Sequence, residues 1–255
     1  MKPNRMKAKL LAGEPTLGVS IMIPSAQMVE IIGALGFDWV LIDCEHGTIS
    51  LETVEAMVMA AEASGITPIA RPTTKRPEDI MQLMDRGTMG VQVPHVNTAE
   101  DAREAVAAVK FHPRGHRGLA AGTRAGGYDL SGSAAEYVQT ANRETLVCIQ
   151  LEEQQAIENV EELLQVEDVD VFFVGPSDLS QSMGYPGNPK AEPVRRAIEA
   201  TFAKIVSAGK IPGTPATADT IRGILDKGVR YVYTHIPKLL GNAAAGYFAA
   251  ARPPR

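Results

Sequence analysis

The chain has 255 residues, of which 45% are hydrophobic and 22% are charged, and its formal net charge is −5. This length suits one large domain or two small ones and is ample for a full hydrophobic core. The negative charge argues against a nucleic-acid-binding protein. No apolar run reaches the roughly 18 residues that cross a bilayer, and no apolar leader follows the basic start. Cys44 and Cys148 are too few for a disulfide framework. We therefore expect a soluble, cytoplasmic protein with no nucleic-acid or membrane partner.

Eight short runs rich in β-branched residues recur along the chain. They are apolar nearly throughout instead of alternating, which is typical of strands buried on both faces. The strands predicted in this way are 17–22, 39–43, 68–71, 91–94, 146–152, 171–174, 211–213 and 231–234. The seventh run, 211–213, has the weakest strand signal, because it is short and contains Pro212 and Gly213.

Apolar residues at spacings of three and four predict helices between these strands. Pro77 opens a helix that ends near Gly87, Thr98 caps the next helix, and Gly209 follows a later one. Eight strands that alternate with helices over this length predict a single-domain α/β protein, a (β/α)8 TIM barrel that spans residues 1–255. The rival is an open doubly wound sheet, which normally has a glycine-rich first turn. Residues 22–25 (MIPS) contain no such turn, so we favour the barrel.

One connection is abnormally long. Residues 111–145 separate the fourth predicted helix from the fifth strand, and loops longer than roughly 12–15 residues are usually functional or disordered. A helix is expected within it at 134–142. The segment is either a surface insertion or subunit contact, or a cover over the substrate. The tail, 251–255, is expected to be disordered.

The active site of a barrel enzyme lies at the carboxyl ends of its strands. The polar residues that follow the predicted strands there are Asp43, Glu45, His46, Arg71, His95, Gln150, Glu152, Ser177, Asp178, Thr234 and His235. Glu152 and Asp178 end neighbouring strands, so their carboxylates would repel each other unless a proton or a cation lies between them. Oxygen ligands favour a hard divalent ion, Mg²⁺ or Mn²⁺. Two solvated acids, or a pair that shares a proton, are the alternatives.

Basic side chains stand beside these acids. Arg71 follows an apolar strand and is expected to point into the mouth, where it can bind a carboxylate or stabilise an oxyanion. The alternative is an ion pair with Glu45 or Asp43. Asp43 stands three positions before His46 and can orient its imidazole, as in acid–base sites, although a lone histidine is more often structural. We interpret Cys44 as a packing residue.

The turn made by Gly175, Pro176 and Ser177 follows a buried strand and is expected to open a short helix. Such a turn exposes backbone N–H groups that suit a small anion, for example a substrate carboxylate. A Schiff-base aldolase needs a lysine desolvated inside the barrel. The lysines of this chain fall in predicted helices, loops or chain ends, with Lys210 at the wrong face and Lys238 beyond the last strand, so imine chemistry is not expected.

Four motifs together carry a resemblance to a known family. They are residues 41–47 (LIDCEHG), 68–72 (PIARP), 150–152 (QLE) and 174–180 (VGPSDLS). In order and spacing they resemble the HpcH/HpaI aldolases, which are metal-dependent class II pyruvate aldolases that include 4-hydroxy-2-oxoheptanedioate and 2-keto-3-deoxy-sugar-acid aldolases. The resemblance implies a barrel that exchanges its last helix with a neighbouring subunit, usually in a homohexamer. It also implies a divalent metal ion (Mg²⁺, Mn²⁺ or Co²⁺) and no organic cofactor.

The same resemblance implies roles on the side of the 2-oxo acid. Glu152 and Asp178 would be the metal ligands, with Gln150 beside them. The backbone of residues 175–178, from Gly175 through Pro176 and Ser177, would hold the carboxylate of pyruvate.

The remaining implied roles concern charge and protons. Arg71 would contact the keto oxygen of pyruvate and of its enolate. His46, held by Asp43, would take part in proton transfer, directly or through a water molecule.

The expected reaction joins the enolate of pyruvate, or of hydroxypyruvate, to an aldehyde, and the reverse reaction cleaves 4-hydroxy-2-oxo acids. Oxaloacetate decarboxylation, which reaches the same enolate, is an expected side activity. The rivals are a citrate-lyase-type enzyme that acts on acyl-CoA thioesters and a barrel that binds a keto acid without catalysis. Because residues 111–128 are only loosely similar to the family, the sequence leaves the aldehyde open.

Overall fold

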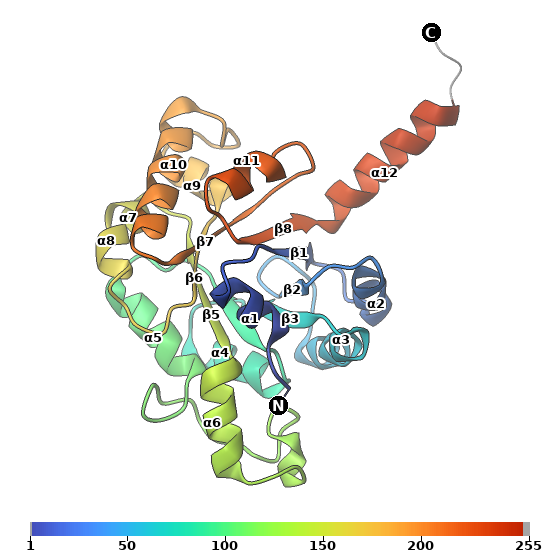
Figure 1. Cartoon of the computed structure of the whole chain (residues 1–255), viewed down its shortest axis with the longest axis vertical. Coiled ribbons are helices and arrows are strands. Elements are labelled where there is room, and N and C mark those ends of the chain that lie inside the picture. Colours follow the sequence, from blue (N-terminus) through green and yellow to red (C-terminus); the bar gives the residue numbers. More distant parts are fainter. Residues whose placement is uncertain (1, 252–255) are drawn as a thin grey trace.

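The computed structural model describes residues 2–251, which form a closed barrel of eight parallel strands in sequence order, with β8 returning to pair with β1. This confirms the predicted TIM barrel (Figure 1). Every predicted strand is present, with ends within two residues of the prediction. The strands are β1 (Thr16–Ile21), β2 (Trp39–Asp43), β3 (Thr67–Arg71), β4 (Gly90–Val93), β5 (Leu146–Leu151), β6 (Val171–Val174), β7 (Ile211–Pro215) and β8 (Tyr231–His235).

Helices surround the barrel. They are α1 (Arg5–Leu11), α2 (Ala26–Ala34), α3 (Leu51–Ser64), α4 (Pro77–Asp85), α5 (Ala99–Val109), α6 (Ala134–Glu144), α7 (Gln154–Glu158), α8 (Val160–Leu163), α9 (Pro176–Ser182), α10 (Glu192–Ser207), α11 (Ile221–Asp226) and α12 (Ile236–Ala251). The predicted boundary signals are confirmed. Pro77 is the first residue of α4, the Thr98 hydroxyl and the Asp101 carboxylate cap α5 reciprocally, and Gly209, with φ of 69°, follows α10.

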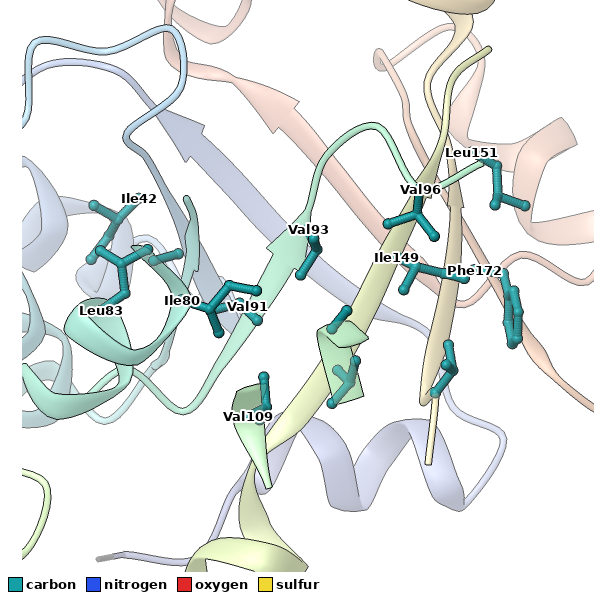
Figure 2. Close-up of a cluster of buried hydrophobic side chains, with 14 of the residues drawn as sticks. Ile42, Ile80, Leu83, Val91, Val93, Val96, Val109, Ile149, Leu151 and Phe172 are labelled. Carbon is teal, nitrogen blue, oxygen red and sulfur yellow. The ribbon is translucent and has the colours of Figure 1, made fainter. Parts of the chain in front are cut away.

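Two apolar clusters hold the barrel together. The larger one lies between the strands and the helices and includes Val91, Ile149 and Phe172; Figure 2 shows Val91 beside Ile80 of α4. The smaller one fills the barrel itself, with Trp39 and Tyr231 in contact at 4.1 Å between ring centroids. The interior is therefore a packed core, and a ligand can enter only at an end of the barrel.

Residues 111–145 lie at the amino-terminal end of the barrel. They connect the end of α5 to the start of β5, and their helix α6 confirms the helix predicted at 134–142. The Nζ atom of Lys7, in α1, donates to the carbonyl oxygen of Thr145 at 2.8 Å. Figure 1 shows α6 beside the amino-terminal end of the chain. Because the active site of a barrel lies at the opposite end, this segment does not cover the substrate site of its own chain.

The last helix, α12, projects away from the barrel (Figure 1). Ile236 is its one buried residue, whereas Leu240, Tyr247 and Phe248 are 58%, 74% and 56% exposed. Ala251, the first residue of the predicted disordered tail, is the last residue of this helix; residues 252–255 of that tail lie outside the described part of the chain. None of the helices within residues 2–251 has the length and apolar character needed to span a membrane.

Candidate active site

A cavity of about 290 Å³ lies at the carboxyl ends of the strands. Eight of the nine predicted site residues line it: Asp43, His46, Arg71, Gln150, Gly175, Pro176, Ser177 and Asp178. The ninth, Glu152, is 2% exposed and lies against Gly175, where an added Cβ would stand 3.2 Å from the Glu152 Oε2 atom. Residues from the ends of four strands, β2, β3, β5 and β6, thus meet at one place, as the strand-end rule predicts.

Glu152 is held in a fixed orientation. Its Oε1 atom accepts the backbone N–H of His95 at 2.9 Å, and its Oε2 atom accepts the amide N–H of Gln150. The Gln150 carbonyl oxygen accepts from Gln92 at 2.6 Å, and the Gln92 oxygen accepts from the Tyr231 hydroxyl at 3.2 Å. Because this series of hydrogen bonds occupies the side-chain oxygen of Gln150, the side-chain nitrogen of Gln150 is the atom that faces Glu152.

The two predicted metal ligands influence each other electrostatically. Burial raises the pKa of the Glu152 carboxyl, and the nearby negative charge of Asp178 raises it further. Two carboxylates with room left by Gly175 form an oxygen donor set that fits a hard divalent cation with open positions for water and substrate. Within residues 2–251, no group of three or more His, Cys, Asp and Glu side chains is arranged to hold a metal ion, so these two carboxylates would be the protein's share of the ligands.

Arg71 is buried against two acids at the bottom of the cavity. Its Nε atom donates to Asp43 Oδ1 at 3.0 Å, its Nη2 atom lies 2.5 Å from Asp43 Oδ2, and its Nη1 atom lies 3.0 Å from Glu45 Oε2. Although burial opposes the charge, the Asp43 carboxylate raises the pKa of the Arg71 guanidinium. The ion pair of Arg71 with Asp43 or Glu45, the alternative raised from the sequence, is therefore present with both acids. Arg71 nevertheless lines the cavity.

Asp43 reaches His46 through the backbone. Its Oδ1 atom accepts the N–H groups of Glu45 and His46, each at 3.2 Å, which fixes the turn that carries the imidazole. The His46 ring is exposed at the cavity, with Nε2 3.8 Å from Glu45 Oε2. A contact of Asp43 with the ring itself stays a prediction.

Burial and the charge of Asp43 raise the pKa of Cys44 to about 12, so its thiol is protonated at neutral pH, in keeping with a packing role.

Two histidines at strand ends received no role from the sequence. His95 follows β4 in a left-handed conformation (φ of 54°), with Nε2 3.2 Å from Glu45 and Nδ1 2.9 Å from Glu153. Burial opposes its protonation, but the carboxylate of Glu152 and the hydrogen bond that the ring makes to Glu153 raise the pKa of His95. His235 ends β8 and lines the cavity. Both follow predicted strands, and this position is the sequence signal that could have marked them as site residues.

Comparison with known proteins agrees with this geometry. The family described as HpcH/HpaI aldolase/citrate lyase matches residues 19–231. A 4-hydroxy-2-oxo-heptane-1,7-dioate aldolase of Shigella sonnei is 37% identical over 97% of this chain and 94% of its own length. A hydroxypyruvate/pyruvate aldolase of Sagittula stellata is 35% identical over 95% of each chain. The crystal structure of a family member from Burkholderia cenocepacia has a TM-score of 0.92 and 27% identity, and the match covers 98% of this chain and all of that one. The chain therefore belongs to the HpcH/HpaI aldolase/citrate lyase family, and it is a carbon–carbon lyase.

Proposed function

We propose that this lyase is a divalent-metal-dependent, class II aldolase. It joins the enolate of pyruvate or hydroxypyruvate to an aldehyde, and in reverse it cleaves 4-hydroxy-2-oxo acids. The observation that carries the proposal is the cavity at the carboxyl ends of the strands, which gathers Asp178, Arg71 and His46 beside the buried Glu152. Two of the relatives are named for 2-oxo acid substrates, in line with such a site.

The 2-oxo acid binds beside Glu152 and the first turn of α9, which carries Asp178. Glu152 and Asp178 would hold a cation such as Mg²⁺, Mn²⁺ or Co²⁺, and Gln150 keeps Glu152 in position. When bound, the cation polarises the keto group and makes the protons on C3 more acidic. Within the backbone of residues 175–178, the N–H groups of Ser177 and Asp178 receive the carboxylate, because N–H groups in the first turn of a helix have no acceptor within that helix. The Gly175 N–H already donates to the Leu151 carbonyl oxygen at 3.2 Å, and Pro176 has no N–H.

Arg71 stabilises the charge that develops on the keto oxygen. A guanidinium has five N–H donors. The two hydrogen bonds to Asp43 engage one donor on Nε and one on Nη2, while Nη1 forms an ion pair with Glu45. The second N–H group on each terminal nitrogen is left for the substrate. A donor aimed at an oxygen that becomes negative gains more from the enolate than from the ketone, and that difference accelerates the step.

His46 moves the proton. Its ring is exposed at the cavity on a turn that Asp43 fixes, so the imidazole accepts a C3 proton directly or through one water molecule. The enolate carbon then attacks the aldehyde carbon, a new C–C bond forms, and the aldehyde oxygen takes up a proton. Retro-aldol cleavage reverses each of these steps. Loss of CO₂ from oxaloacetate gives the same enolate, so we include decarboxylation as a side activity.

We also propose that the chain works as a homo-oligomer, with a hexamer as the expected form. The helix α12 projects away from the barrel, and its exposed apolar side chains need an apolar partner. A second copy that receives this helix supplies one.

The two free thiols, Cys44 and Cys148, are typical of a reducing compartment, so we place the enzyme in the cytoplasm.

Proton exchange tests the reaction class without knowledge of the aldehyde. Pyruvate is incubated in D₂O with metal-free protein, and then with Mg²⁺, Mn²⁺ or Co²⁺ added, while NMR follows the methyl signal. We expect deuteration that requires a metal, and a parallel sample of the Glu152→Gln variant should show little. Absence of exchange with all three metals, or equal exchange without metal, would refute the proposal.

A further inference from the structure

Two polar side-chain atoms at the seam between β1 and β8 lack a hydrogen-bond partner within the described residues. They are the Oγ atom of Ser20 and the Nδ1 atom of His235. The strand register pairs these two residues directly, so both side chains point to the same face of the sheet. Tyr231 and Tyr233 alternate with His235 on the inner face of β8, in the apolar cluster that fills the barrel, so this shared face is the barrel interior.

One residue of this pair lies at the active-site cavity. His235 lies on the cavity wall, as do Arg71 and Tyr233, whereas Ser20 is 1% exposed. Buried polar atoms in proteins are rarely left without a partner, and those that are call for an unseen water molecule or ligand. One such atom on a residue of the cavity wall, and a second on the buried residue paired with it in register, indicate a polar subsite that a bound molecule completes.

The charge state of His235 restricts what this molecule is. Burial lowers the pKa of His235, and the positive charge of Arg71 lowers it further. Asp43 acts in the opposite direction and Lys238 in the same direction as Arg71, so the ring is neutral at pH 7. A neutral imidazole has one N–H donor and one acceptor nitrogen, and the Ser20 hydroxyl both donates and accepts. A hydroxyl group, which also donates and accepts, complements this pair better than an anion does.

The ring is also held in place. Its centroid lies 5.3 Å from that of Tyr233 at an interplanar angle of 85°, an edge-to-face contact. A ring fixed in this way presents its nitrogens in set directions, as a group that reads a substrate must.

We propose that His235 and Ser20 form a hydroxyl-binding subsite that gives this aldolase a preference for hydroxylated substrates. The identity of the substrates rests on the function proposed above. The hydroxyl comes either from C3 of the donor, as in hydroxypyruvate, or from the carbon beside the carbonyl of the acceptor, as in glycolaldehyde. The His235 ring contacts the hydroxyl, and the Ser20 Oγ atom, which makes no hydrogen bond to the ring, supplies the second partner.

Paired substrates separate the two sources. The first arm compares C3 deuteration of hydroxypyruvate with that of pyruvate, and the second compares pyruvate addition to glycolaldehyde with its addition to propanal. His235→Phe should lower one of these two rate ratios by roughly tenfold, the size expected for one neutral hydrogen bond. His235→Gln should restore part of the loss, because the amide can still donate and accept. Ser20→Ala should lower the same ratio by a smaller factor.

Lys238→Ala is the matched control. It removes an exposed charge near His235 but leaves both polar atoms of the subsite, so both ratios should stay at the wild-type value. Equal losses for hydroxylated and unhydroxylated substrates in both arms would overturn the proposal and reduce His235 to a wall residue or a water ligand.

A binding measurement keeps this proposal separate from the proposed function. The ¹⁵N signals of His235 are followed in the wild-type protein, loaded with Mg²⁺, as hydroxypyruvate, pyruvate, glycolaldehyde or propanal is added. A shift caused by one hydroxylated compound and absent with its partner supports the subsite even if no proton exchange occurs. Unchanged signals with all four compounds would contradict the subsite even in an active enzyme.

Discussion

Replacement of Arg71 by methionine tests the charge arrangement on which the proposed chemistry depends. The substitution keeps an apolar stem of similar length but leaves Asp43, which is fully buried, with only the N–H groups of Glu45 and His46. Removal of one partner of a buried ion pair costs about 3–5 kcal/mol. For a chain of this size that lowers the melting temperature by roughly 6–20 °C. Loss of an oxyanion donor should also slow pyruvate deuteration by about 10²–10³-fold.

Two companion variants separate stability from catalysis. Arg71→Met combined with Asp43→Asn removes the stranded charge while the Asn oxygen still accepts the backbone N–H groups, so much of the lost stability should return without the activity. Arg71→Lys should recover little activity, because an ammonium cannot reproduce the planar arrangement that reaches Asp43, Glu45 and the substrate at once.

The assays are urea denaturation of the metal-free variants and deuterium exchange at saturating metal and pyruvate. The double variant should be more stable than Arg71→Met alone, and pyruvate affinity should fall far less than the exchange rate. Two results would refute the reasoning. One is a free energy of unfolding of Arg71→Met within about 1 kcal/mol of the wild-type value, well below the loss expected for a stranded buried charge. The other is an equal loss of pyruvate affinity and of the deuterium-exchange rate, which would show that Arg71 only binds the substrate.

Three further outcomes are expected. Glu152→Ala or Asp178→Ala should abolish turnover by weakening metal binding while the fold survives; elemental analysis with full metal occupancy in both variants would remove them from the set of ligands. His46→Ala should lower pyruvate exchange by roughly 10²–10⁴-fold with the metal still bound, and exchange at the wild-type rate would leave His46 at most a role toward the aldehyde. Burial and the charge of Lys7 lower the pKa of Lys110 from its ordinary value of 10.5 to about 7. Between these values the unfolded chain binds a proton that the folded chain does not, so this lysine makes the free energy of unfolding rise with pH. Lys110→Met should flatten that rise in urea titrations from pH 7 to 10, and an unchanged slope would contradict the low pKa.

The sequence predicted the barrel because its signals are local. A strand of a parallel barrel is buried on both faces, so β2 and β6 appear in the sequence as continuous apolar runs, and their predicted ends are correct to the residue. Local chemistry likewise marks the ends of helices, as Thr98 does for α5. The weakest prediction, β7, is present and extends to Pro215, because pairing with β6 and β8 stabilises a segment whose own strand propensity is low.

The sequence also predicted which residues gather at the cavity, because the carboxyl ends of barrel strands meet at one end whatever the register. Which side chains touch there was decided by the tertiary structure. The contacts of Arg71 with both Asp43 and Glu45 depend on the register of β2 against β3, and the pairing of Ser20 with His235 depends on the closure of β8 onto β1. Residues 111–145 lie at the end away from the cavity because α5 returns the chain to that end before β5 begins. Composition and spacing describe neighbours along the chain, whereas hydrogen-bond partners are set by strands far apart in sequence, and only the closed barrel brings those strands together.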